Sequence, residues 1–237
     1  MDHSDTLILE AIQTANKFNY WMYETIAPYC NGKTLEIGSG IGNISKFFLQ
    51  EEKDIALSDY SEKYCQVLEK QFEEYSQSLN VFQIDLAEKQ FSQKFADHQA
   101  EFDSVFALNV IEHIEDDHQA IQNIHSLLKP EGHIVILVPA YQWLFGSLDE
   151  IVDHHRRYNK KTLAQLLEVN GFDLVHKQYF NFMGIFPWWF VSKVLKRKII
   201  KKDQMKLYNI LVPFFKLVDK IMFNSAGLSV ICVGKKR

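Results

Sequence analysis

One segment of the sequence has the residue types and spacing of a ligand-binding loop. Residues 35–43 read LEIGSGIGN, and they follow an apolar run and precede a helical pattern. Gly38, Gly40 and Gly42 remove side chains where the backbone must turn tightly and approach a ligand closely. We therefore predict that this loop joins a strand to a helix and binds a nucleotide-like molecule.

Polar residues after the neighbouring strands support this prediction. Asp59 ends the second apolar run, where nucleotide-binding α/β folds place a carboxylate that binds ribose hydroxyls. Asp85 and Asn109 are expected at the same edge, because ligands bind outside the carboxyl ends of the strands. Glu36 of the loop segment, Asp85 and Asn109 could each have a structural role instead. Glu36 could be a solvated strand-end acid, Asp85 the N-cap of a helix at 86–90, and Asn109 a turn former.

The glycine spacing and the nearby charge narrow the choice of ligand. Dinucleotide-binding loops space their glycines by two and then three residues, whereas both intervals are two here. Glu36 precedes the first glycine by two residues, where a carboxylate suits an ammonium or hydroxyl groups better than a pyrophosphate. No Lys-Ser/Thr pair follows, as it would in a P-loop. These features disfavour a nicotinamide-dependent oxidoreductase and a triphosphate-binding protein.

Alternating apolar and amphipathic segments predict the elements that position the loop. This alternation is typical of a parallel α/β sheet with helices on both faces. The predicted strands are 34–38, 55–58, 81–84, 104–108, 133–138, 172–179 and 228–233. The predicted helices are 5–30, 43–50, 62–75, 117–128 and 161–169, with Pro28 ending the first pattern and Gly132 and Gly171 as helix stops. We predict one domain over 1–237, with an N-terminal helical segment over 1–30 and a helical insert over 180–227.

Several motifs, in order, resemble those of class I S-adenosylmethionine-dependent methyltransferases over roughly residues 30–180 and a final strand at 228–234. The glycine loop resembles the first motif, Asp59 the ribose-binding acid, and residues 83–86 the segment that contacts adenine. Residues 102–114 (FDSVFALNVIEHI) resemble the fourth strand with its Glu-His turn, and residues 127–133 (LLKPEGH) the loop before the fifth strand. The resemblance implies a Rossmann-like fold with a mostly parallel seven-stranded sheet. It also implies S-adenosylmethionine as cofactor and S-adenosylhomocysteine as its product.

The same resemblance implies which residues hold the cofactor. The loop amides and the helix start after Gly42 would meet its carboxylate, and Glu36 its ammonium. Tyr60 would lie against the adenine. The implied cofactor-binding residues are Glu36, Gly38, Ser39, Gly40, Gly42, Asp59, Tyr60, Asp85, Leu86 and Asn109.

The segment after the fifth predicted strand contains the candidate catalytic residue. Residues 153–158 read DHHRRY and resemble a His-x-Arg-Arg-Tyr loop in a subset of these enzymes, with Asp153 where that loop often has glycine. Histidine titrates near neutrality, so we predict that His154 is a base or a group that positions the acceptor. The predicted substrate residues are Tyr141, Arg156, Arg157 and Tyr158.

A structural reading of this loop also stays open. The arginines could bind an anionic acceptor or carboxylates of the fold itself. The whole loop could serve only to form surface ion pairs with Asp149, Glu150 and Asp153. His113 is expected to be a packing residue rather than a base, and the sequence predicts no metal site.

The charge of the chain is divided unevenly along the sequence. The formal net charge is -4, yet residues 1–179 are strongly acidic and residues 180–237 strongly basic. Residues 180–227 are also rich in aromatic side chains, which suits an interfacial element on an anionic membrane through 180–220. A lid over a hydrophobic acceptor, a homodimer interface and a helical cap with a solvated basic face are the alternatives. Nucleic acid is disfavoured because the rest of the domain is acidic.

Composition limits the class of protein. Hydrophobic residues make up 47% and charged residues 24% of 237 residues, which excludes disorder, collagen and coiled coil as descriptions of the whole chain. Cys30, Cys65 and Cys232 match no metal or redox spacing, and so sparse a set suggests a reducing compartment. The polar N-terminus shows no secretory signal, so we expect a cytoplasmic protein, with membrane association left open.

The resemblance implies a methyltransferase, and we expect it to act on a small-molecule or lipid-linked acceptor, with oxygen as the methylated atom. The alternative is a non-catalytic S-adenosylmethionine-binding regulator or partner subunit. The fold does not identify the acceptor.

Overall fold

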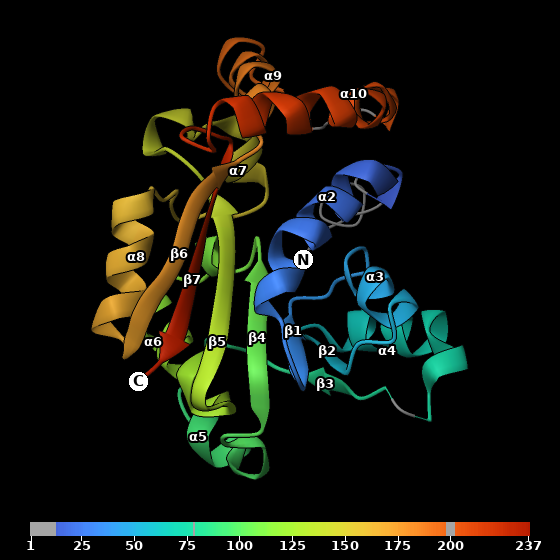
Figure 1. The fold of residues 1–237 in the computed structure, drawn as a ribbon, viewed down its shortest axis with the longest axis vertical. Coiled ribbons are helices and arrows are strands. Elements are labelled where there is room, and N and C mark those ends of the chain that lie inside the picture. Colours follow the sequence, from blue (N-terminus) through green and yellow to red (C-terminus); the bar gives the residue numbers. More distant parts are fainter. Residues whose placement is uncertain (1–12, 78, 198–201) are drawn as a thin grey trace.

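The computed structural model describes residues 13–77, 79–197 and 202–237, which form a single sheet covered by helices (Figure 1). The strand order is β3-β2-β1-β4-β5-β7-β6, and β7 is antiparallel to both of its neighbours. The strands are β1 (Thr34–Ile37), β2 (Ile55–Asp59), β3 (Val81–Gln83), β4 (Phe102–Leu108), β5 (Leu128–Pro139), β6 (Phe172–Phe180) and β7 (Ser229–Lys236). This confirms the predicted mostly parallel seven-stranded sheet of a Rossmann-like fold.

Helices cover both faces, which is why the central strands are buried on both sides. One hydrophobic core lies under α5, α6 and α8, and the other under α2, α3, α4 and α10. The α-helices are α2 (Asn16–Ile26), α3 (Ser45–Gln50), α4 (Glu62–Gln71), α5 (Phe91–Lys94), α6 (Asp117–Leu127), α7 (Ser147–Ile151), α8 (Lys160–Val169), α9 (Ile185–Trp189) and α10 (Lys202–Ile221). The short helices are η1 (Ala27–Tyr29), η2 (Glu73–Tyr75), η3 (Ala96–His98), η4 (Ile111–His113), η5 (Gln142–Leu144), η6 (Phe182–Gly184) and the π-helical η7 (Phe190–Val194).

The register of the parallel strands brings the predicted ligand-binding residues to one edge of the sheet. Ile37 at the end of β1 is aligned with Ser58 of β2 and with Ala107 of β4. The glycine loop, Asp59 and Asn109 therefore leave the sheet together, at its carboxyl edge. This edge is where open α/β sheets bind ligands.

One local prediction and one open alternative were wrong. Residues 86–90 form no helix, because Asp85 accepts a hydrogen bond from the Ala87 amide (2.8 Å) and closes a turn instead, and α5 begins only at Phe91. Gly132 lies inside β5 rather than after a helix, because the chain enters the strand directly at Leu128. The short helix α7 was not predicted. Residues 5–12 of the predicted first helix lie outside the described residues.

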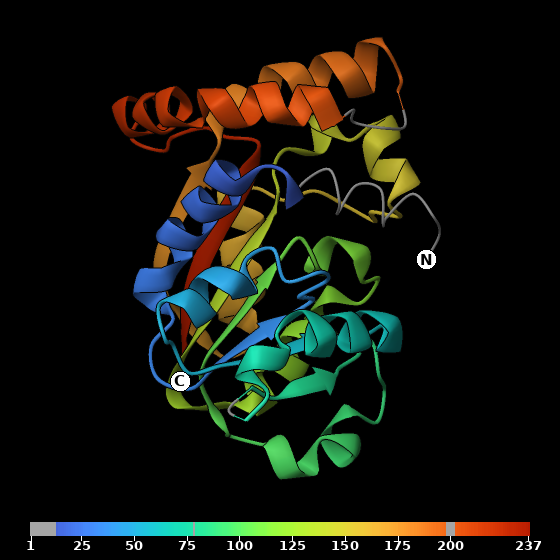
Figure 2. The same ribbon diagram turned by 90° about the vertical axis from the view of Figure 1, so that its right-hand side faces the viewer.

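The segment between β6 and β7 forms α9, η7 and α10, which lie across the carboxyl end of the sheet (Figures 1 and 2). Asp219 of α10 anchors this layer. It is 4% exposed, and its two oxygens accept hydrogen bonds from the backbone amides of Asn181 (2.6 Å) and Phe182 (2.8 Å) just after β6. Val212 and Phe215 of α10 join the core beneath α2. None of the helices in the described part of the chain is long and apolar enough to cross a bilayer.

We expect replacement of Asp219 with Ala to destabilise the protein by about 2–4 kcal/mol, because two buried amides lose their acceptor. D219N keeps one carbonyl oxygen as an acceptor, so its free energy of unfolding should fall by less. Urea unfolding of both variants measures this, with K220A on the exposed neighbouring residue as the control. Equal unfolding free energies for D219A and K220A would contradict this account of how α10 is attached.

Candidate active site

The glycine loop adopts a backbone conformation that requires glycine. Gly38, Gly40 and Gly42 have φ values of 73°, 56° and 73°, in the left-handed region that L-residues rarely adopt. A Cβ atom on Gly38 would lie 2.4 Å from Cγ2 of Val110, and one on Gly42 would lie 2.5 Å from Cε2 of Phe72. The loop is therefore packed tightly between the residues after β4 and the end of α4.

Glu36 lies beneath this loop and connects β1 to α3. The residue is 4% exposed, and its carboxylate accepts a hydrogen bond from the Ser45 hydroxyl at the start of α3. Burial raises the pKa of Glu36 to about 7, although hydrogen bonds from Ser45 and Ser39 favour the charged form. Glu36 is thus a buried acid at the edge of the site rather than a solvated strand-end residue.

Asp59 is held at the end of β2 by the loop itself. Its Oδ2 accepts a hydrogen bond from the Gly40 amide (3.0 Å), and its Oδ1 accepts one from the Ser61 amide (2.9 Å). Burial raises the pKa of Asp59, while these amide hydrogen bonds favour its charged form. A carboxylate oxygen accepts more than one hydrogen bond, so Asp59 keeps capacity for ligand hydroxyls. The next residue, Tyr60, is 43% exposed.

The remaining predicted cofactor residues lie along the same edge. Asn109 is exposed and has a φ of 54°, which fits the turn-forming role left open for it. Asp85 is exposed, whereas Leu86 is buried in the core, so only its backbone can face a ligand. The strand-end acid, the left-handed glycine loop and the exposed aromatic ring fit S-adenosylmethionine, the cofactor implied by the sequence.

His154 is fixed by a buried carboxylate on the side of the sheet edge that follows β5. Its Nδ1 lies 2.8 Å from Oδ1 of Asp149, and only 8% of its side chain is exposed. Its Nε2 lies 3.8 Å from Oε1 of Glu112, which is completely buried. In this geometry Nδ1 faces Asp149 and Nε2 faces Glu112.

Asp149 is also bound by Arg157. The guanidinium donates to both oxygens of Asp149 at 2.8 and 3.1 Å and to the Ala140 carbonyl at 2.9 Å. Burial alone would raise the pKa of Asp149, but His154 and Arg157 hold it below its usual range. Trp188 of α9 covers the guanidinium, with 4.8 Å between its ring centroid and Cζ of Arg157. The insert therefore packs directly onto the His154 network.

Two contacts connect this network to the glycine loop. The His155 amide donates a hydrogen bond to the Glu112 carbonyl (2.8 Å), which joins the 153–158 loop to η4. Val110, two residues before Glu112, packs against Gly38. The candidate acceptor side and the candidate cofactor side thus meet at the end of β4.

Three predicted substrate residues point elsewhere. Arg156 forms an ion pair with Asp117 (2.8 Å), and the Tyr158 hydroxyl donates to the same carboxylate (2.8 Å). Both line a cavity of about 370 Å³ between α6 and α8. Tyr141 stacks on Tyr179 with ring centroids 4.9 Å apart, and burial raises its pKa to about 12. The structure groups Arg157, but not these three residues, with His154.

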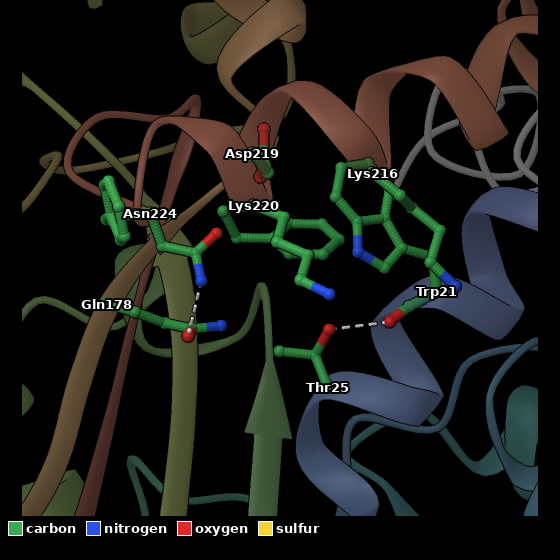
Figure 3. A pocket seen from close by; sticks show the side chains of 9 residues that line it. Trp21, Thr25, Gln178, Lys216, Asp219, Lys220 and Asn224 are labelled. Atoms are coloured by element: carbon green, nitrogen blue, oxygen red, sulfur yellow. Dashed lines mark hydrogen bonds between the residues drawn. The ribbon is translucent and has the colours of Figure 1, made fainter.

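A larger cavity lies on the opposite side of the sheet. It measures about 440 Å³ and is bounded by α2, β6 and the end of α10 (Figure 3). Inside it the Thr25 hydroxyl donates to the Trp21 carbonyl (2.8 Å), and Asn224 donates to Gln178 (3.1 Å). Neither of these two cavities is lined by the glycine loop or by His154.

Sequence reasoning missed three participants in the site. Glu112 was noted only within a Glu-His motif, Asp149 only as a surface ion-pair partner, and Trp188 only as part of an aromatic run. His113, expected to be a packing residue, is exposed and contacts the His154 ring with centroids 4.6 Å apart. In the sequence, Asp149 lies five residues before His154, which could have suggested a contact between them. That spacing does not indicate that the two side chains are buried.

Comparison with known protein families gives one match over most of the chain. Residues 22–177 match the family model described as "Methyltransferase domain". A match of this extent covers β1 to β5, the glycine loop and the His154 loop.

Individual relatives are more distant. The chain is 27% identical to "Methyltransferase OMS1, mitochondrial" of Saccharomyces cerevisiae over 201 residues, which covers 76% of this chain and 42% of the relative. It is 31% identical to "Hybrid PKS-NRPS synthetase thnA" of Trichoderma harzianum over 130 residues, or 53% of this chain. The chain spans 3–6% of the lengths of the polyketide synthases that it matches.

Solved structures share the fold. One is the Burkholderia thailandensis 1,6-didemethyltoxoflavin-N1-methyltransferase, with 1,6-didemethyltoxoflavin and S-adenosylhomocysteine bound. The TM-score is 0.56 at 16% sequence identity, and the alignment covers 94% of this chain and 78% of the other.

The buried acid Glu36 makes the stability of the protein depend on pH. Since burial raises its pKa from 4.5 to about 7, the folded chain holds a proton there that the unfolded chain has already lost. The free energy of unfolding should therefore fall as pH rises through this window. E36Q cannot ionise at this position, so its free energy of unfolding does not fall in this way. As pH rises from about 5 to about 8, the free energy of unfolding of E36Q should increase by on the order of 2–3 kcal/mol relative to that of the natural protein.

Urea unfolding at both pH values measures this difference. Glu69, an exposed acid of α4, supplies the control variant E69Q, whose difference from the natural protein should not change with pH. An E36Q difference that is the same at both pH values would show that Glu36 is ionised in the folded protein at pH 5.

Proposed function

This chain belongs to the methyltransferase family whose model matches residues 22–177, and from that premise we propose that it methylates a hydroxyl oxygen of a lipid-linked or small-molecule acceptor. The enzyme is a class I methyltransferase and uses S-adenosylmethionine as its cofactor. When bound, this cofactor supplies a methyl group on a positively charged sulfur. We propose the class of the acceptor, the atom that is methylated and the roles of the individual residues.

The cofactor side uses the carboxyl edge of β1, β2 and β4. The amides of the glycine loop bind the carboxylate of the amino-acid part, and Glu36 lies next to its ammonium. Asp59 accepts hydrogen bonds from the ribose hydroxyls, and the exposed ring of Tyr60 covers the adenine. Their positions, set by the strand register and by the hydrogen bonds of Asp59, support this arrangement.

The observation that carries the proposal is the buried imidazole–carboxylate pair of His154 and Asp149. A hydroxyl must lose its proton as its oxygen bonds to the methyl carbon, so an oxygen acceptor needs activation. His154 is the activating group, and its Nε2 faces the end of β4 beside the glycine loop. Arg157 and Trp188 keep this side rigid, which matters because in-line transfer requires alignment of the reacting atoms.

Replacing His154 with Ala should lower kcat by roughly 10²-fold or more, because the acceptor loses its activating group. Affinity for S-adenosylhomocysteine, measured by calorimetry, should stay unchanged because His154 does not touch the glycine loop. H155A, at the exposed neighbouring histidine, is the control and should keep its activity. A normal kcat for H154A would remove His154 from the mechanism, and weakened cofactor binding would place it on the wrong side of the site.

A lipid-linked acceptor is supported by the outer face of α10. Leu207, Ile210, Leu211, Phe214, Leu217 and Ile221 follow the helical period and are each 42–65% exposed. The opposite face of the helix carries the buried residues Val212, Phe215 and Asp219. Phe186, Trp189 and Phe190 add exposed aromatic rings from the preceding helices. We call these nine exposed side chains the apolar stripe.

Charge favours an anionic membrane surface as the partner of the apolar stripe. Exposed cations accompany it on the same segment, namely Lys193, Lys196, Arg197, Lys206 and Lys220. Apolar and aromatic side chains with flanking cations are the features of an element that lies in the interface of an anionic bilayer. Docked in this way, the layer of α9 and α10 turns the carboxyl edge of the sheet toward the lipid surface (Figure 2).

Vesicle co-sedimentation tests the membrane surface. The protein should bind vesicles containing phosphatidylserine, less so at high salt, and bind phosphatidylcholine vesicles weakly. The double variant I210S/F214S should lose binding, because two exposed side chains of the apolar stripe become polar. V169S/V175S, at exposed apolar positions on α8 and β6, should bind like the natural protein. If I210S/F214S instead dissociates a dimer and leaves vesicle binding intact, the apolar stripe is a subunit interface.

A further inference from the structure

Three ligand-bearing side chains converge where the His154 loop meets the end of β4. They are the carboxylate of Glu112 and the imidazoles of His113 and His154, and one ligand atom from each lies within 4.8 Å of the other two. Glu112 and His113 belong to η4, whereas His154 comes from a loop about forty residues later. The hydrogen bond between the His155 amide and the Glu112 carbonyl brings the two segments together.

Glu112 has an unsatisfied carboxylate inside this cluster. The residue is 0% exposed, and neither of its oxygens has a hydrogen-bond partner among the residues that the structure describes. A buried carboxylate without partners is costly, and native structures almost always provide one. The nearest basic group is Nε2 of His154 at 3.8 Å, which is too far for a hydrogen bond. Within the described residues, the Glu112 carboxylate is therefore left without a hydrogen-bond donor.

His154 is oriented as a metal-ligating histidine usually is. A ligating histidine donates its second ring N–H to a carboxylate or a backbone carbonyl, which fixes the tautomer and turns the other nitrogen toward the metal. Nδ1 of His154 is hydrogen-bonded to Oδ1 of Asp149 (2.8 Å), which leaves Nε2 on the side of Glu112.

We propose that Glu112, His113 and His154 bind a divalent transition-metal ion, and that this ion holds the acceptor oxygen. Two imidazoles and one carboxylate form a binding set that leaves positions open for substrate. The binding of the ion stands on these residues alone, while its role in catalysis rests on the proposed methyl transfer.

The ion accounts for how His154 activates the acceptor. A hydroxyl bound to a divalent ion has a lowered pKa and loses its proton to solvent at neutral pH. The oxygen then forms the bond to the methyl carbon, and the electron pair of the broken carbon–sulfur bond stays on sulfur. His154 thus acts through the ion, and Asp149 and Arg157 keep its ring in place.

Direct titration with Co²⁺ tests the site on the full chain after metal removal. The natural protein should bind about one Co²⁺ per chain and develop a visible absorption band, since the ligand set is complete in the folded chain. E112Q, which keeps the side-chain volume, and H113A, at an exposed position, should each weaken binding roughly tenfold or more. H118A, on an exposed face of α6, is the matched control and should bind Co²⁺ normally.

Binding of S-adenosylhomocysteine by the same samples separates this proposal from the proposed function. Normal cofactor binding by E112Q shows that the variant is folded. Equal Co²⁺ binding by the natural protein and E112Q, or no Co²⁺ binding by a sample that binds the cofactor, would overturn the metal site. Full methyl transfer in the presence of a chelator would overturn its catalytic role, while leaving the methyltransferase assignment intact. Failure to bind the cofactor at all would instead count against the proposed function.

Discussion

The buried ion pair between Arg157 and Asp149 is the interaction on which the rest of the site depends. Both side chains are essentially excluded from water, and the guanidinium meets both carboxylate oxygens. Removing one partner of such a pair typically costs about 3–5 kcal/mol, because the other charge stays buried alone. The pair also fixes neighbouring segments, since Arg157 reaches the end of β5 and lies under Trp188, and Asp149 orients His154. This ion pair therefore fixes the positions of the 153–158 loop, of Trp188 in the insert and of the candidate catalytic residue His154.

The site is surrounded by acids that the fold holds out of water. Burial raises the pKa of Glu36, Asp59 and Glu112, each at the end of a central strand or just after it. A stable core has no need of such groups, because burying a carboxylate works against folding. Hydroxyl and amide donors partly compensate the burial of Glu36 and Asp59, whereas the described part of the chain offers no donor to the Glu112 side chain. Glu112 therefore differs from the other two acids in the donors that the fold provides, and this difference motivates the proposed metal site.

The insert before the last strand has two different faces. Its inner face belongs to the core, where Val212 and Phe215 pack beneath α2 and Trp188 covers Arg157. Its outer face leaves a helical row of apolar side chains in contact with water, which folding alone does not explain. Because Trp188 on the inner face packs on Arg157, a partner bound to the outer face would lie one helical layer away from the candidate site. The basic part of the sequence, residues 180–237, contains this insert, whereas the acidic part forms most of the sheet domain.

The sequence alone determined the sheet, the glycine loop and the family, because these depend on local patterns. Apolar runs, glycine spacing and a strand-end acid are properties of neighbouring residues, and they predicted seven strands and the edge at which Asp59 lies. The sequence did not determine which charged residues meet. Arg156 and Arg157 are adjacent in the chain, yet one side chain pairs with Asp117 and the other with Asp149. Only the tertiary structure decided that Glu112 would be buried beside His154 without a hydrogen bond, because that depends on how two distant loops pack.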